Sequence, residues 1–261
     1  MGIGILYFFV ILIVISTGAV AGISGGVILR PVFDLIGYHN AVSISFYMAV
    51  AVLTMAISST MKQISLGTKI DFGKVLTLAL GSITGGFVGQ SIFNAISYLI
   101  SQNAVQILQG ILSIALLIFV FMFTKEGIKT YQFKSKVLYL LIGFVLGTVA
   151  SILAIGGGPI NVIAFMILFG ITIKEATVYS ITTIFFTQVS RLIMLATNPG
   201  FATFDLGILV FVVPAAIMGG IIGGRLNVKM PATAVLKVFK GVLIATILLN
   251  IFNVVNFWLN L

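Results

Sequence analysis

The stretch Ala154–Pro159, "AIGGGP", places three glycines and a proline between two long apolar runs. An earlier stretch, Gly22–Gly26, "GISGG", repeats this feature. Relative to alanine, glycine costs about 1 kcal/mol and proline about 3 kcal/mol in the interior of a helix. Both glycine strings are therefore predicted to interrupt helices.

The composition indicates an integral membrane protein. Hydrophobic residues make up 60% of the 261 positions and charged residues only 7%, against roughly 25% charged in an ordinary soluble domain. The absence of cysteine excludes disulfides and thiolate metal sites. The net charge is +9, but the basic residues are dispersed between apolar runs, which is typical of membrane topology signals. We expect a lipid bilayer as partner, and no nucleic acid, metal, cofactor or enzymatic activity.

The apolar runs predict ten membrane segments. A hydrocarbon core of about 30 Å needs roughly 20 helical residues. Two runs are too short, Val27–Gly37 and Pro159–Gly170, and each directly follows a glycine string. We expect each string to run extended for about five residues, roughly 16 Å, and then to start a half-helix near the midplane. The other eight runs reach or approach full length: 2–23, 40–61, 73–100, 103–124, 137–155, 174–197, 205–225 and 233–258.

The basic residues predict the orientation of these segments. If all ten cross, every Lys and Arg except Arg191 lies on one side. The links "GYHN", "SQN", "GGGP" and "TNPGFATFD" on the other side carry none. The positive-inside rule then places both termini outside the cytoplasm of a multi-pass protein in the cell (inner or plasma) membrane.

An internal repeat covers the chain. Residues 1–124 and 137–261 form two units of five segments, joined by a basic cytoplasmic loop, 125–136. Because five is odd, the second unit must be inverted. In both units, glycines follow an aspartate by 14, 15 and 18 residues: Gly85, Gly86 and Gly89 after Asp71, and Gly219, Gly220 and Gly223 after Asp205. These six glycines are expected to pack helices closely, and the two aspartates to cap them.

The predicted fold is an all-α polytopic membrane protein with two inverted five-segment repeats, eight full-length helices and two half-helix crossings. Secondary transporters have this architecture, with the substrate at the midplane where the repeats meet. The start of a half-helix presents unpaired N–H groups and the positive end of the helix dipole. Two such starts form a site for a small anionic substrate, and Pro159 suits a first helical position.

The predicted substrate-binding residues lie at the glycine strings or on the segments beside them. Thr182 and Thr183 could complete the shell. Arg30 has an alternative partner in Asp34, four residues on, and Arg191 could instead extend to the outer interface. The full set is Ser24, Gly25, Gly26, Arg30, Ser45, Gly156, Gly157, Gly158, Asn161, Ser180 and Arg191.

Two copies of a glycine string before a short proline-containing helix, "GGVILRPVFDLIG" and "GGGPINVIAFMILFG", resemble the TauE/SafE sulfite exporter family. Two further patterns occur once in each half of the chain: an Ala-x-x-x-Ser helix start, and a Gly-x(3–4)-Asp sequence before a glycine-rich helix. They extend the resemblance over nearly the whole chain. It implies an inner-membrane carrier that exports sulfite, thiosulfate or organosulfonates. The family's glycine-proline strings correspond to Gly25, Gly26 and Pro31 in the first half of this chain, and to Gly156, Gly157 and Gly158 in the second half. The chain departs from the pattern at Ser24, where a third glycine is common, at Arg30 and at Pro159.

Alternating access is the expected mechanism, and two other functions stay open. An intramembrane serine protease could use Ser24 as nucleophile and His39 as base, although a straight half-helix would separate them by about 20 Å. An anion channel is the other alternative. No acidic residue is marked as a proton relay, so a coupling proton or ion is also left open.

Overall fold

The computed structural model describes residues 2–68, 71–99, 102–124, 130–133, 135–153, 157–197 and 200–259. These residues form α-helices and two short 3₁₀ turns, and no strand occurs within the described ranges. The α-helices are α1 Gly2–Ala21, α2 Gly26–Ile36, α3 Ala41–Ser65, α4 Phe72–Leu99, α5 Gln102–Phe123, α6 Lys136–Ile152, α7 Gly158–Phe169, α8 Ile173–Thr197, α9 Leu209–Lys229 and α10 Ala232–Leu259.

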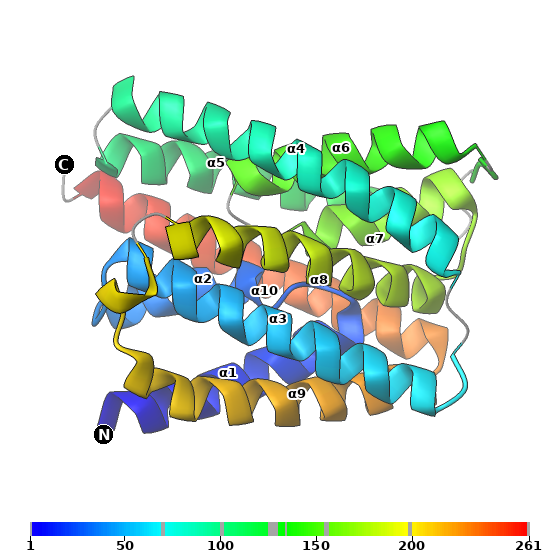
Figure 1. Cartoon of the computed structure of the whole chain (residues 1–261), viewed down its shortest axis with the longest axis horizontal. Coiled ribbons are helices and arrows are strands. Elements are labelled where there is room, and N and C mark those ends of the chain that lie inside the picture. Colours follow the sequence, from blue (N-terminus) through cyan, green and yellow to red (C-terminus); the bar gives the residue numbers. More distant parts are fainter. Residues whose placement is uncertain are drawn as a thin grey trace.

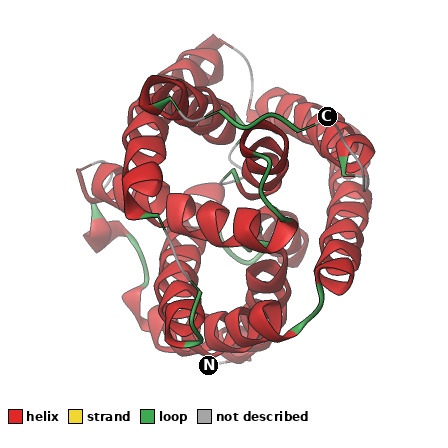
Figure 2. Ribbon diagram, turned by 90° about the vertical axis from the view of Figure 1, so that its right-hand side faces the viewer, coloured by secondary structure: helices red, strands yellow, loops and turns green. Residues whose placement is uncertain are grey.

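The helices form a single elongated bundle, with both chain termini at the same end (Figure 1). Figure 2 looks along this bundle and shows most of the helices nearly end-on. The short helices α2 and α7 start inside the bundle and run toward opposite ends (Figure 1). The chain therefore reverses direction twice within the interior.

The helix boundaries agree with the ten predicted segments within four residues. The largest differences, four residues each, are at the end of α3, Ser65 against 61, and at both ends of α9, Leu209–Lys229 against 205–225. The chain before α9 forms the 3₁₀ turns Phe201–Thr203 and Leu206–Ile208. Because the Asp205 carboxylate accepts a hydrogen bond from the Gly207 N–H at 2.9 Å, the aspartate caps the second turn and the α-helix starts four residues later.

Among the described residues, six helices are long and apolar enough to cross a membrane: α1, α3, α4, α8, α9 and α10. Of the other two helices predicted to be full-length, α5 has 22 residues and α6 has 17. The molecule therefore has the make-up of a multi-pass membrane protein, and the count of eight full-length crossings stays a prediction.

Close helix packing depends on glycine, as the sequence predicted. A Cβ on Gly85 would lie 2.0 Å from the Phe144 carbonyl oxygen of α6, and one on Gly223 would lie 2.4 Å from the Ser16 oxygen of α1. Gly89, Gly219 and Gly220 are equally confined by neighbouring helices. Gly86 is the exception: it lines a cavity instead. These glycines let α4 lie on α6 and α9 lie on α1 and α3.

One end of the bundle collects the basic helix termini. In Figure 1, α3 and α9 end on the right, where α4, α6, α8 and α10 begin. The Lys174 ammonium of α8 donates to the Val228 carbonyl of α9 at 2.8 Å, which ties two of these termini together. The opposite end holds both chain termini and the described parts of two links that carry no Lys or Arg, 37–40 and 200–205 (Figure 1).

Candidate functional site

The first glycine string is a compact turn between α1 and α2. Gly22 has a positive φ of 70°, and the Ile23 N–H donates to the Gly18 carbonyl at 2.9 Å, which is the usual geometry of a glycine after a helix. Gly25 already has a right-handed helical backbone. The expected extended run of five residues is therefore wrong here: four residues suffice, because left-handed Gly22 reverses the chain.

The second string ends in the start of α7. Gly157 caps this helix with a positive φ of 79°, and Pro159 lies in its first turn, where a proline's missing N–H costs no helical hydrogen bond. Gly156, a predicted site residue, lies outside the described residues together with Ala154 and Ile155.

The two strings meet in the interior. A Cβ on Gly158 would lie 2.3 Å from the Ser24 backbone nitrogen and 2.7 Å from the Ile23 Cα. Only a glycine permits this approach. The Ser180 hydroxyl donates to the Gly22 carbonyl at 2.7 Å and lies 3.3 Å from the Gly158 carbonyl oxygen. Three predicted residues, Ser24, Gly158 and Ser180, are thus brought together where α2 and α7 begin.

Asn227 of α9 belongs to the same region, although sequence reasoning missed it. Its side chain is buried, and its amide donates to the Val20 carbonyl at 2.7 Å and to the Thr177 hydroxyl at 2.9 Å. It fixes the end of α1 to α8 beside the first string. An amide in an apolar membrane helix is a recognisable signal, because such groups hydrogen-bond across helices.

The remaining predicted residues of the strings differ in their surroundings. A Cβ on Gly25 would meet the Ile15 side chain at 2.5 Å, whereas one on Gly26 would make ordinary contacts with Met48 and Val52 of α3. Asn161, in the first turn of α7, is 3% exposed, and its amide oxygen has no hydrogen-bond partner. The first turn of α7 therefore offers a buried, unpartnered polar group.

The two predicted arginines are both held by side chains. Arg30 Nε donates to the Asp34 carboxylate at 3.0 Å, so its expected alternative partner is confirmed. Arg191 Nη2 of α8 donates to the Ser45 hydroxyl of α3. The Arg191 side chain is therefore directed to the neighbouring helix α3 rather than to the outer interface. Arg191 and Ser45 are both predicted site residues, and the structure brings them into contact.

The hydroxyls of Thr182 and Thr183 do not extend the site as expected. Each donates to the carbonyl four residues earlier in α8, at 2.9 and 2.8 Å. Such bonds to the parent helix satisfy the hydroxyl hydrogen in an apolar environment. Neither hydrogen is available to an anion.

His39 belongs to an aromatic cluster at the far end of α2. Its Nδ1 lies 2.8 Å from the Tyr7 hydroxyl, and its ring contacts those of Tyr38 and Tyr47. Burial lowers the pKa of His39, opposed in part by the nearby Asp205 carboxylate. Because the 11 residues of α2, about 16 Å of helix, separate His39 from Ser24, the geometry does not favour a protease dyad.

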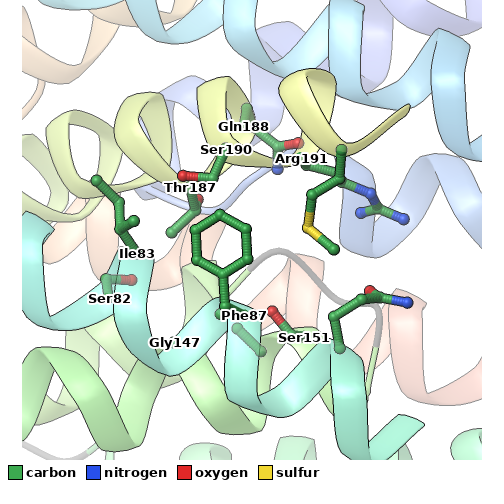
Figure 3. A pocket seen from close by; sticks show the side chains of 13 residues that line it. Ser82, Ile83, Phe87, Gly147, Ser151, Thr187, Gln188, Ser190 and Arg191 are labelled. Carbon is green, nitrogen blue, oxygen red and sulfur yellow. The ribbon is translucent and has the colours of Figure 1, made fainter. Parts of the chain in front are cut away.

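Two cavities lie along the seam between α4, α6 and α8. The first, which we name the Gln188 cavity, has a volume of about 50 Å³. Figure 3 shows Thr187, Gln188, Ser190 and Arg191 of α8 facing Ser82, Ile83 and Phe87 of α4 across it. Its remaining lining residues are Gly86, Gln90, Gly147, Ala150, Ser151 and Met194.

The second, the Lys74 cavity, has a volume of about 120 Å³ and lies at the basic end of the bundle. It is lined by Lys74, Leu78, Gln132, Phe133, Tyr139, Phe169, Ile171 and Tyr179. Leu78 of this cavity and Ser82 of the first are one helical turn apart on α4, about 6 Å. Both cavities therefore follow one seam.

Comparison with known proteins identifies the family. Residues 7–250 match the sequence profile described as "Sulfite exporter TauE/SafE". The chain belongs to the TauE/SafE family. The resemblance inferred from the doubled glycine strings is thereby confirmed.

A curated member of this family is similar along almost its whole length. It is described as "Probable membrane transporter protein YunE" from Bacillus subtilis (strain 168), is 26% identical over 272 residues, and the match covers 90% of this chain and 94% of that protein. No solved structure matches the chain. Family membership and the apolar helices together make this protein a membrane transporter of the TauE/SafE family and do not favour the protease.

Proposed function

We propose that the protein is a secondary transporter that exports small sulfur-containing anions, such as sulfite, thiosulfate or organosulfonates, across the plasma membrane. The observation that carries the proposal is the contact of Gly158 with Ser24, which brings the starts of α2 and α7 together. Each start contributes the positive end of a helix dipole. An anion between them is stabilised without a dedicated lysine.

Two arginines, one on α2 and one on α8, support an anion rather than a cation as the substrate. Arg30 and Arg191 carry two positive charges, and Asp34 neutralises one of them through its 3.0 Å ion pair. Asn161 adds a buried amide in the first turn of α7. Its amide hydrogens suit a sulfur oxyanion because such ions accept hydrogen bonds only.

The helix contacts support two inverted repeats, 1–124 and 137–261, joined by the loop 125–136. In these repeats, α1 corresponds to α6 and α4 corresponds to α9. The two most extensive helix contacts are α4 with α6 and α9 with α1. Replacing each helix of the first pair by its counterpart gives the second pair. The opposite directions of α2 and α7 (Figure 1) agree with an inversion. The gathering of basic termini at one end favours a cytoplasmic location for that end and extracytoplasmic chain termini.

The two cavities support alternating access. Two buried residues, Leu146 of α6 and Thr183 of α8, lie in sequence between residues that line the two cavities, and they form the proposed barrier. The Lys74 cavity lies at the basic end and the Gln188 cavity farther along the seam. Rocking of one repeat against the other would open this barrier toward one face and then the other.

Transport by purified protein in liposomes tests the proposal. We expect uptake of ³⁵S-labelled sulfite or thiosulfate to accelerate when the lumen is loaded with the unlabelled anion, because a carrier exchanges its substrates. A channel conducts without such acceleration. Sulfate, methanesulfonate and acetate in the lumen establish the substrate range.

A matched pair of variants tests the location of the site. Gly26→Trp should abolish exchange, because a Cβ at this position already lies 3.4 Å from the Met48 methyl and 3.8 Å from the Ser24 hydroxyl. Gly241→Trp on α10 is the control, since nothing lies within 4 Å of its Cβ position. Normal exchange by Gly26→Trp, at control expression levels, would contradict the proposed site.

A further inference from the structure

We infer that three polar side chains of α3, Ser59, Thr60 and Gln63, bind water and form a hydrated entrance from the basic end of the bundle to the first glycine string. We name these residues the Gln63 cluster. The inference rests on the proposed function for the cytoplasmic location of that end and for the passage of a solute. It adds an entrance beside α3, apart from the Lys74 cavity, which is lined by α4, α6, α7 and α8 and by the links before α6 and α8.

The last turns of α3 concentrate buried polar atoms that lack a hydrogen-bond partner. The described part of the chain has six such side-chain atoms, and four belong to the Gln63 cluster: Ser59 Oγ, Thr60 Oγ1, and both Oε1 and Nε2 of Gln63. Ser59 and Gln63 are each 0% exposed. A buried polar group without a partner destabilises the folded state, and native proteins contain few of them. The cluster therefore requires a ligand.

The three side chains are neighbours on the surface of α3. Residues three and four apart on a helix lie beside one another, so Gln63 is next to both Thr60 and Ser59. Hydroxyls in apolar helices commonly donate to the carbonyl four residues earlier, as Ser58 does to Thr54 at 2.9 Å. The hydroxyls of Ser59 and Thr60 make no such bond, and both are available to a ligand.

The combination of donors and acceptors selects water as this ligand. The Gln63 amide has an unpartnered donor, Nε2, and an unpartnered acceptor, Oε1, and a hydroxyl can act in either role. A cation would leave Nε2 unpaired, and an anion that only accepts would leave Oε1 unpaired. Water both donates and accepts, and a buried water typically makes about three hydrogen bonds to otherwise unpartnered groups.

The cluster lies beside α9 at the basic end of the bundle. A Cβ on Gly224 of α9 would lie 3.0 Å from the Ser59 hydroxyl oxygen, so Ser59 faces α9. Gln63 is two residues from the end of α3 at Ser65, where α9 also ends (Figure 1). Ser59 is six residues from that end, about 9 Å along the helix. Water that enters at the basic end therefore passes Gln63 before it reaches Ser59.

Polar groups continue from the cluster toward the first glycine string. Asn227 lies three residues after Gly224 on α9, and its buried amide donates to the Thr177 hydroxyl of α8 at 2.9 Å. A Cβ on Gly22 of the string would lie 2.7 Å from Thr177 Cγ2. Because α3 packs on both α8 and α9, polar side chains line the way from the basic end to the string.

Cysteine labelling tests the inference. The chain contains no cysteine, so each single-cysteine variant reports on one position. Gln63→Cys and Ser59→Cys are treated with the membrane-impermeant anionic thiol reagent 2-sulfonatoethyl methanethiosulfonate, in intact cells and in inverted membrane vesicles. Both should react preferentially in inverted vesicles, where the cytoplasmic face is outside. Thr60→Cys replaces either variant if it is not produced.

Two cysteine variants of α10 are matched controls. Val235 and Phe239 are also 0% exposed, and they lie three and seven residues from the start of α10, at the same end of the bundle. Val235→Cys and Phe239→Cys should react at least about tenfold more slowly than the cluster variants, because thiols buried in apolar surroundings are inert. Equal rates in controls and cluster variants overturn the inference, since labelling would then reflect general opening of the bundle.

Replacement of Gln63 tests the direction of entry. Gln63→Leu combined with Ser59→Cys should react at least about tenfold more slowly than Ser59→Cys alone, because leucine offers water no hydrogen bond at the entrance. Gln63→Asn combined with Ser59→Cys retains an amide and should react nearly as fast as Ser59→Cys alone. Equal rates in all three variants overturn the entrance at Gln63.

The remaining outcomes separate the entrance from the proposed function. Complete modification of Gln63→Cys should block anion exchange in liposomes, and normal exchange after modification overturns the entrance while it supports a transporter. Slow labelling of the cluster from both sides overturns the inference without bearing on transport. Preferential labelling in intact cells overturns it together with the proposed orientation, and exchange by the unmodified protein still tests transport.

Discussion

Replacement of Gly158 by alanine tests whether the direct contact of the two glycine strings determines the stability of the site. The new Cβ would lie 2.3 Å from the Ser24 nitrogen, 2.7 Å from the Ile23 Cα and 2.9 Å from the Ile23 carbonyl carbon. All three are backbone atoms, so no side-chain rotation relieves the overlap, and the strings must separate by about 1 Å to reach ordinary contact distances. Overpacking of this kind costs about 1–3 kcal/mol.

The assay is thermal unfolding of the purified protein together with anion exchange in liposomes. In a chain of this size, 1 kcal/mol corresponds to roughly 2–4 °C, so Gly158→Ala should lower the melting temperature by about 2–12 °C and reduce exchange. Gly241→Ala is the control: its Cβ meets nothing within 4 Å, and removal of a helix-interior glycine should stabilise by up to about 1 kcal/mol. If Gly158→Ala melts like this control and exchanges normally, the contact does not determine the site.

Three further perturbations address the surroundings of the site. Ser180→Ala should destabilise the protein by about 1–3 kcal/mol, because the Gly22 carbonyl loses its buried donor. Thr183→Ala should destabilise it less. Equal decreases in melting temperature would contradict the role of Ser180 in holding the first glycine string. Asp205→Ala should cost about 1 kcal/mol through loss of the cap on Gly207, and Asp205→Asn should restore most of the lost melting temperature. Burial lowers the pKa of His39 from its ordinary 6.5, so the unfolded chain binds a proton at a higher pH than the folded protein does. The melting temperature should therefore decrease as the pH is lowered through about 6.5. An equal decrease in a His39→Gln variant would exclude His39 as the cause.

The sequence by itself determined the class and the segmentation of this protein. The scarcity of charge and the length of the apolar runs require helices in a bilayer, because unpaired backbone groups are too costly in lipid. Glycine and proline mark the helix ends through local conformational preference, so the starts of α2 and α7 were predicted within one residue. The Asp71 cap was predicted for the same local reason, and its carboxylate accepts from the Gly73 and Lys74 N–H groups.

The tertiary structure alone decided which groups meet. Nothing in the sequence near Gly158 or Ser24 predicts that the two backbones lie too close for a Cβ on Gly158. Nothing near Ser180 predicts that its hydroxyl donates to the Gly22 carbonyl of the first string. The same holds for Arg191, whose partner Ser45 lies 146 residues away, and for Gln188, whose amide oxygen is left unpaired only once α4, α6 and α8 are packed. Helix ends follow from interactions within a few residues, whereas a binding site depends on contacts between distant segments that only the folded packing creates.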